Sequence, residues 1–149
     1  MLRPESRGWV KLKSSDPAMA PAINPNFLSD ERDLHLLRDA ARLMYRIAET
    51  PPLSDMGARD RSPIDYNDDA ALEARIREVS DTIYHPVGTC RMGSDADSVV
   101  DPKLKARGVE GLWIADASIM PRLVSGNTNA PSIMIGERAA DFVRTELAA

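Results

Sequence analysis

The stretch Tyr84-His85-Pro86-Val87-Gly88-Thr89-Cys90-Arg91-Met92-Gly93 is the most informative part of this chain. It places one of the chain's two histidines just before a proline and a Gly-Thr pair. Proline stiffens the backbone after His85, and Gly88 permits a tight turn or a close approach to a ligand. Imidazole is the side chain that titrates nearest to neutral pH, so His85 is a candidate general base. A lone histidine is more often structural, and the residues alone leave both interpretations open.

A second polar cluster is Gly126-Asn127-Thr128-Asn129-Ala130-Pro131-Ser132, which leads into an apolar, helix-like segment. We expect a closing helix from Pro131 to about Leu147, because proline is tolerated in the first turn. Asparagine is common at helix N-caps and in turns, and Asn129 is a candidate cap. The amide of Asn127 can donate a hydrogen bond to an alcohol oxygen but cannot accept a proton at neutral pH. In a catalytic site the base would therefore be His85 alone.

These two stretches, in this order and at this separation, resemble the C-terminal signature of the glucose–methanol–choline (GMC) family of flavin-dependent alcohol oxidoreductases. The resemblance extends from Arg3-Pro4-Glu5-Ser6-Arg7-Gly8 through Asp141. It implies that residues 1–149 form the C-terminal, substrate-binding and catalytic domain of such an enzyme. It further implies that a small primary alcohol is oxidised to an aldehyde with FAD as cofactor. In that setting His85 and Asn127 are the expected catalytic residues.

The resemblance also implies which residues lie along the cofactor. Asp116 and Ala117 are expected beside the ribityl and pyrophosphate part of FAD. The backbone of Thr128 and Asn129 is expected to reach the pyrimidine side of the flavin ring. A helix that begins near Pro131 presents N–H groups and positive potential, which would stabilise negative charge on a reduced flavin.

Enzymes of this family begin with a dinucleotide-binding unit whose Gly-x-Gly-x-x-Gly turn holds the pyrophosphate. No such turn occurs among the eight glycines of this sequence. We therefore expect an N-terminal FAD-binding half as a partner, and expect the isolated chain to be inactive. An exposed apolar patch is expected near Leu112, Ile114 and Ile133. The alternative, a truncated and noncatalytic remnant that serves as a binding domain, stays open.

The expected fold is α+β, an antiparallel sheet packed by helices, without βαβ alternation. Strand patterns occur at Trp9–Lys13, Thr82–Tyr84 and Gly111–Asp116, and the Pro-rich segment up to Pro25 is expected to cross the surface in extended form. The resemblance implies that the last strand and the closing helix complete an FAD-binding domain.

Two further helices are expected between the strands. The first has Ser29 as a candidate N-cap and is stopped by Pro51-Pro52, and the second runs from Asp68 to Val79. Their apolar residues recur at helical spacing and predict one buried face on each helix. These residues are Leu34, Leu37, Ala41, Met44, Tyr45 and Ala48 in the first helix, and Leu72, Ile76 and Val79 in the second.

Composition excludes several classes of protein. The formal net charge of -4 over 149 residues gives no basic field for nucleic acid or anionic lipid. No run approaches the length of a membrane span, and the segment Met1 to Arg7 lacks the apolar core of a signal peptide. A single cysteine, Cys90, fits a reducing compartment, so a cytoplasmic location is expected. Cys90 and His85 are too few ligands for zinc, so Cys90 is expected to be a small buried residue.

Overall fold

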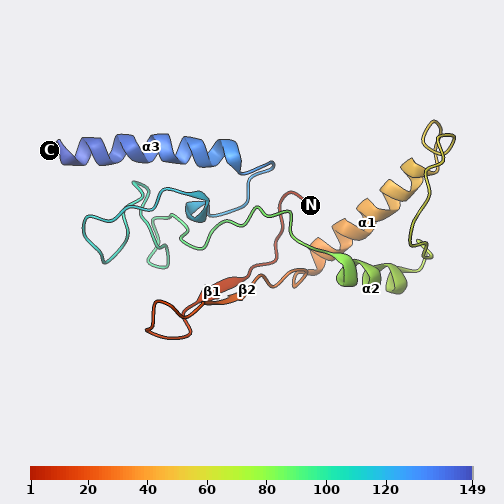
Figure 1. The fold of residues 1–149 in the computed structure, drawn as a ribbon, viewed down its shortest axis with the longest axis horizontal. Helices are drawn as coiled ribbons and strands as arrows, with labels where there is room; N and C mark the ends of the chain where they lie inside the picture. The colour runs from red at the N-terminus through yellow and green to blue at the C-terminus, as the bar shows by residue number, and fades with distance from the viewer. Residues whose placement is uncertain (149) are drawn as a thin grey trace. The chain divides into compact units, whose positions relative to one another are not determined.

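The computed structural model describes residues 1–148, which divide into two compact units (Figure 1). The first unit comprises Arg3–Asp81 and the second begins at Thr82. Each unit has a hydrophobic core of its own. Antiparallel strands and helices are both present, as the sequence predicts for an α+β fold.

The sheet of the first unit consists of β1 (Trp9–Lys11) and β2 (Ala22–Asn24), paired antiparallel with Val10 opposite Ile23. The segment expected to be only an extended crossing thus supplies the partner of the first strand. Gly8 directly precedes β1 and lies against the end of β2. A Cβ at this position would collide with the carbonyl oxygens of Asn24 and Pro25. A residue without a side chain is therefore required at this point.

Helix α1 (Glu31–Ala48) packs on helix α2 (Asp69–Val79) in the first unit. The N-cap of α1 is Asp30, whose carboxylate accepts from the Arg32 N–H, so the prediction of Ser29 as cap is wrong by one residue. Asp68 caps α2 in the same way. An aspartate before a helix accepts free first-turn N–H groups and places negative charge at the positive end of the helix dipole.

The core of the first unit is formed by Leu34, Leu72 and Ile76, and the rings of Tyr45 and Tyr66 stack with centroids 4.3 Å apart. The expected buried faces extend too far at their C-terminal ends, since Met44 is 64% exposed and Val79 is 53% exposed. Because α2 has 11 residues and α1 has 18, α2 is too short to cover the whole length of α1.

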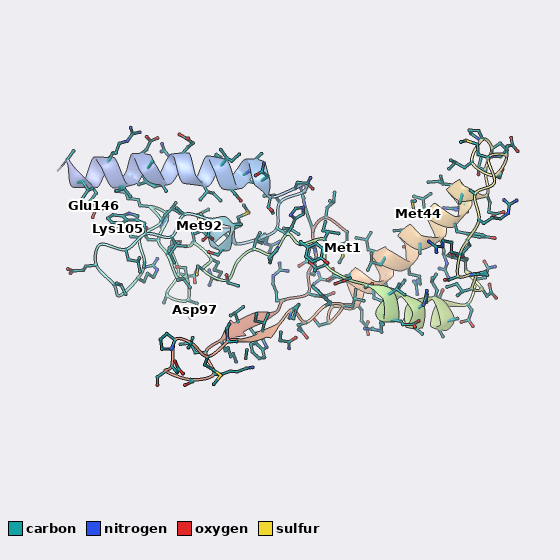
Figure 2. The ribbon with its side chains drawn as sticks, in the orientation of Figure 1. Met1, Met44, Met92, Asp97, Lys105 and Glu146 are labelled. Atoms are coloured by element: carbon teal, nitrogen blue, oxygen red, sulfur yellow. The ribbon has the colours of Figure 1, made fainter. Side chains whose placement is uncertain are left out.

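Helix α1 also carries an exposed apolar stripe, one member of which, Met44, is labelled in Figure 2. Of its four members, three are spaced by four, seven or eleven positions, which places them on one face of a helix, and the fourth, Met44, directly follows Leu43 at the border of that face. They are Leu36, Leu43, Met44 and Ile47, of which Leu36 is 52% exposed and Leu43 49% exposed.

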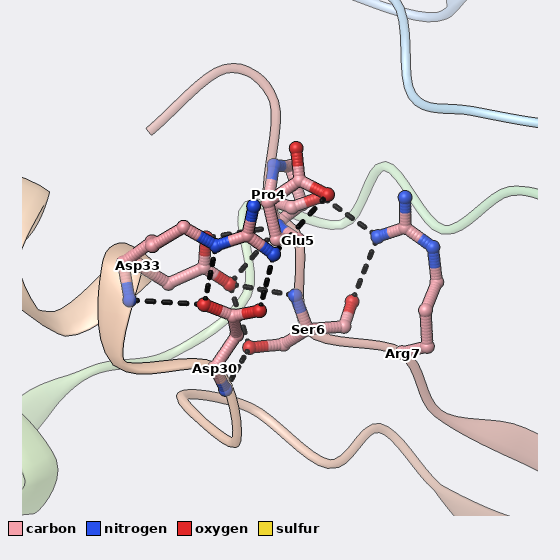
Figure 3. A network of polar contacts seen from close by, with 7 residues as sticks. Pro4, Glu5, Ser6, Arg7, Asp30 and Asp33 are labelled. Atoms are coloured by element: carbon pink, nitrogen blue, oxygen red, sulfur yellow. Dashed lines mark hydrogen bonds and ion pairs between the residues drawn. The ribbon is translucent and has the colours of Figure 1, made fainter.

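A buried carboxylate ties the start of the chain to α1 (Figure 3). Asp33 is only 2% exposed, and its oxygens accept from the backbone N–H of Glu5 at 2.9 Å, the N–H of Ser6 at 2.8 Å and the Ser6 hydroxyl at 2.6 Å. Burial raises the pKa of Asp33, but the Ser6 hydroxyl and the two backbone N–H groups together outweigh burial and leave the pKa below its usual value. The ionised form is therefore the one that the folded protein favours.

The second unit contains helix α3 (Asn129–Leu147) and a short 3-10 helix, η1 (Ala117–Ile119). The core consists of Val100, Leu104, Ile119, Met120, Ile135 and Ala139. The expected end of α3 is confirmed, whereas Asn129 is its first helical residue and Thr128 is its N-cap. Asn129 as the cap is therefore wrong.

The loops of the second unit are joined by single bridges instead of ladders. Residues 82–84 form no strand, because Tyr84 has φ 61° and turns the chain directly before His85. Within residues 111–116 only Trp113 is bridged, to Lys105. The neighbouring Leu104 (φ 66°) and Gly108 (φ 76°) bend the partner segment at both ends, which limits the pairing. The buried strand expected at Gly111–Asp116 is therefore wrong, since only this isolated bridge forms there.

The Asp33 contacts generate a stability prediction. Asp33→Ala leaves three donors without their acceptor, and we expect it to lower the free energy of unfolding by about 2–3 kcal/mol at neutral pH. Because the pKa of Asp33 is depressed in the folded state, this contribution is present above the unfolded value near 3.8 and is lost as pH falls below it. Urea unfolding followed by circular dichroism at several pH values measures both effects. Asp39→Ala, an exposed carboxylate on the same helix, is the control; equal losses in the two variants would contradict the assignment.

Candidate active site

The segment that carries His85 is shaped by two residues with positive φ. Tyr84 (φ 61°) precedes the histidine, and its N–H donates to the Thr82 hydroxyl at 3.0 Å. Gly88 (φ 89°) follows it, and a Cβ on Gly88 would lie 3.2 Å from the Met120 carbonyl oxygen. The left-handed region and the close approach both favour glycine at position 88. The Gly-Thr turn predicted from the sequence is therefore the point where this segment meets the end of η1.

Two backbone hydrogen bonds hold the same segment on η1. The N–H of Cys90 donates to the Ser118 carbonyl at 3.0 Å, and the N–H of Met92 donates to the Ile119 carbonyl at 2.8 Å. Ile119, only 1% exposed, belongs to the core that also buries Ile135 of α3. Packing thus connects the histidine segment to α3 through η1. Cys90 itself is half-buried, so its expected full burial is wrong.

His85 is held directly by the residue that begins α3. Its Nδ1 lies 3.1 Å from the hydroxyl oxygen of Thr128, with both side chains partly buried. The Thr128 carbonyl accepts from the N–H of Ser132 at 3.0 Å and from the Ser132 hydroxyl at 2.6 Å. The two stretches that the sequence singles out are therefore joined by a side-chain contact. The sequence had suggested only a backbone role for Thr128, so this use of its hydroxyl was missed.

Of the remaining candidate residues, two are the sequence neighbours of Thr128 and two lie at the start of η1. Asn127 directly precedes Thr128 and is exposed, and Asn129 is the exposed first residue of α3. Asp116 is the N-cap of η1, and its carboxylate accepts from the Ser118 N–H at 2.7 Å. The hydroxyl and the backbone N–H of Ser118 lower the pKa of Asp116 against the effect of burial. Ala117 follows as the first residue of η1.

The N-terminus of α3 differs electrostatically from those of α1 and α2. Those helices have acidic residues at the N-cap and in the first turn, whereas α3 has no acidic residue in its first turn and no side-chain cap. The N–H groups at the start of a helix have no intrahelical acceptor, and the dipole adds positive potential there. The start of α3 is therefore suited to a ligand group that accepts hydrogen bonds or carries negative charge.

Two of the three positions expected in an exposed apolar patch are confirmed as exposed. Leu112 is 46% exposed and Ile133 is 59% exposed, whereas Ile114 is half-buried and packs against the core of the second unit. The far end of α3 is joined to a loop by the Lys105–Glu146 ion pair, 2.6 Å from Nζ to Oε1 (Figure 2). Across residues 1–148, no helix has the length and apolar character needed to span a membrane.

Comparison with known proteins identifies the family. The sequence model described as GMC oxidoreductase matches residues 4–136. A GMC-type oxidoreductase of Mycobacterium tuberculosis, itself uncharacterized, is 48% identical over 97% of this chain and 28% of its own length. The oxygen-dependent choline dehydrogenase of Cronobacter sakazakii is 46% identical, covering 96% of this chain and 26% of its own. The alcohol dehydrogenase [acceptor] of Pseudomonas putida is also 46% identical, over 95% and 26%.

Solved structures agree with the sequence matches. Formate oxidase of Aspergillus oryzae, from a study of FAD modification, superposes with a TM-score of 0.90 at 30% identity, over 98% of this chain and 26% of that chain. Pyridoxine 4-oxidase of Mesorbium loti gives a TM-score of 0.84 at 34% identity, over 94% and 28%. The chain belongs to the GMC oxidoreductase family. It spans between 26% and 28% of the length of these relatives.

The role of Ile119 in holding the histidine segment generates a prediction. Ile119→Ala removes a fully buried side chain, and we expect the free energy of unfolding to fall by about 2–5 kcal/mol. Ile133→Ala is a matched control because the same side chain is 59% exposed there, and we expect a change within about 0.5 kcal/mol. Thermal and urea unfolding of both variants measure the difference. Similar losses would contradict the position of Ile119 in the core.

Proposed function

We propose that this chain is the C-terminal, catalytic part of a flavin-dependent oxidoreductase that acts on CH–OH groups and converts a primary alcohol to an aldehyde. Family membership and the relatives named choline dehydrogenase and alcohol dehydrogenase support this class of reaction. The observation that carries the proposal is the contact between His85 and Thr128, 3.1 Å long, beside the uncapped start of α3. It joins a candidate base to a site suited to an electron-rich ligand.

In this proposal His85 accepts the hydroxyl proton of the alcohol. Thr128 engages Nδ1, so Nε2 is the ring nitrogen that remains for the substrate. Loss of the proton increases negative charge on the substrate oxygen, and the amide of Asn127 is expected to donate a hydrogen bond to that oxygen. Asparagine stays neutral through the reaction, so the proton is taken up by His85 alone.

The start of α3 fits FAD as the proposed cofactor, which when bound accepts the hydride from the α-carbon of the alcohol. The backbone of Thr128 and Asn129 is proposed to reach the pyrimidine side of the ring, because N–H groups at the start of a helix have no intrahelical acceptor. Asp116 and Ala117 are proposed to lie along the ribityl and pyrophosphate part. The sequence has no Gly-x-Gly-x-x-Gly turn for the pyrophosphate, so an N-terminal FAD-binding half is the proposed partner.

A chimera provides the test of the catalytic assignment. In it, this chain replaces the matching C-terminal segment of the Mycobacterium tuberculosis relative, which is 48% identical to it. We expect His85→Ala to slow flavin reduction by a primary alcohol by about 10²–10⁴-fold, the usual cost of losing a positioned base. Stopped-flow absorbance measures this rate. His35→Ala is the control, because His35 is exposed on α1 and is the only other histidine of the sequence.

The outcomes of this experiment separate the two candidate functions. A loss below about threefold in His85→Ala would refute the base assignment. A chimera that binds FAD but oxidises no alcohol would favour the alternative, a binding domain that has kept the fold without the activity.

A further prediction concerns the chain by itself. We expect purified chain to be colourless, and titration with FAD to show no saturable fluorescence quenching at low micromolar concentration. The residues proposed to hold FAD supply only part of its contacts, and hydride transfer needs the reacting atoms held about 3–3.5 Å apart in a rigid site. The chimera, in contrast, should be yellow. A chain that binds FAD stoichiometrically on its own and oxidises alcohols would overturn the proposed need for a partner.

A further inference from the structure

The threonine at the N-cap of α3 does not cap its helix. Thr128 has helical backbone angles (φ -86°, ψ -4°) and makes no side-chain capping bond. In contrast, the N-cap residues Asp30, Asp68 and Asp116 have extended backbones, and each accepts first-turn N–H groups. Loss of a cap typically costs about 1 kcal/mol of helix stability. The Thr128 hydroxyl is therefore available for a contact outside its helix.

Pro131 removes one of the two backbone donors that could compete for this hydroxyl. An N-cap hydroxyl accepts from the N–H of the second or third helical residue, and Pro131 is the third residue of α3, which begins at Asn129. Proline has no N–H, so the donor used in a capping box is missing. The other donor, the Ala130 N–H, makes no bond to the Thr128 hydroxyl, whose residue has helical instead of extended backbone angles. The Thr128 carbonyl already accepts two hydrogen bonds from Ser132. The hydroxyl is left free of the helix and lies 3.1 Å from His85 Nδ1.

We propose that Thr128 is a positioning residue that fixes the ring and the tautomer of His85, and that Pro131 keeps its hydroxyl available for this purpose. The Nδ1–H of His85 donates to Thr128 Oγ1, so the lone pair is on Nε2. The partner of one ring nitrogen determines which nitrogen carries the proton. This inference rests on the proposed function for its catalytic meaning, whereas the tautomer itself can be measured without any activity.

The direction of the hydrogen bond follows from the proposed proton transfer. When Nε2 takes a proton, both ring nitrogens carry hydrogens, and Nδ1–H still has its acceptor in Thr128 Oγ1. The same bond therefore serves both protonation states without rotation of the ring. If the hydroxyl instead donated to Nδ1, the neutral ring would carry its hydrogen on Nε2, which could then not accept the substrate proton. A hydroxyl has one donor and two acceptor positions, so Thr128 can accept from Nδ1–H and still have its own hydrogen to donate.

Nuclear magnetic resonance of the full chain tests this tautomer directly. The two histidines of the sequence give two imidazole patterns in long-range ¹H–¹⁵N spectra, and His35 serves as an internal reference. At about pH 9, where imidazole is ordinarily neutral, we expect His85 to be a single tautomer protonated on Nδ1. Thr128→Val keeps the shape and backbone but removes the acceptor, so we expect a mixture of tautomers. Thr128→Ser should restore the single form.

Pro131→Ala provides an independent variant with Thr128 intact. The substitution introduces an N–H at the third helical position, which competes for the Thr128 hydroxyl. We therefore expect His85 to become a mixture of tautomers, as in Thr128→Val. Circular dichroism should show that the helix content is not reduced. A wild-type His85 protonated on Nε2 would overturn the proposal. An unchanged His85 pattern in both Thr128→Val and Pro131→Ala would also overturn it.

The chimera separates this proposal from the proposed function. We expect Thr128→Val to slow flavin reduction about 10-fold with little change in the KM for alcohol, as for other residues that orient a catalytic group, and Thr128→Ser to recover most of the loss. If Thr128→Val shifts the tautomer while His85→Ala leaves the rate unchanged, the proposed function fails and the positioning contact stands. If His85→Ala abolishes reduction while Thr128→Val changes neither tautomer nor rate, the positioning proposal fails alone.

Discussion

The burial of Ile119 is the constraint on which the second unit depends. This unit has no strand ladder among its described residues, so the paths of its loops are set by packing and by a few backbone bonds. Ile119 packs in the same core as Ile135 of α3, and its carbonyl holds the N–H of Met92 at 2.8 Å. The position of the histidine segment relative to the start of α3 therefore follows from one well-packed side chain at the end of a single-turn helix.

The helices were predicted well because caps, apolar spacing and prolines act on residues close to them in the sequence. Aspartates, apolar spacing and prolines mark α1, α2 and the end of α3 within one or two residues. The short strands were harder to predict because pairing depends on the partner segment. The β-prone sequence at residues 82–84 was expected to be a strand, but Tyr84 adopts φ 61° and ends any extended run there. Residue propensity gives no indication of such a turn.

In the candidate site, too, the residues could be named from the sequence, whereas the contact between them could not. His85 and Asn127 were proposed as site residues from their side-chain chemistry and from the family resemblance of the motifs that carry them. The contact between His85 and Thr128 joins side chains 43 residues apart, so only the folded chain shows it. One signal was nevertheless present in the sequence: a threonine before a helix with proline three residues later cannot complete a capping box. That pattern excludes one of the two usual capping bonds of the hydroxyl and makes a partner outside the helix easier to form.

The apolar stripe of α1 has a consequence for how the chain behaves in solution. Leu36, Leu43, Met44 and Ile47 face water along one side of a helix, and water-exposed apolar rows favour association over dispersion. The formal net charge of -4 over 149 residues provides only weak mutual repulsion between molecules. Dilute samples should therefore scatter light as single chains, and concentrated samples should show a growing hydrodynamic radius that Met44→Glu reduces.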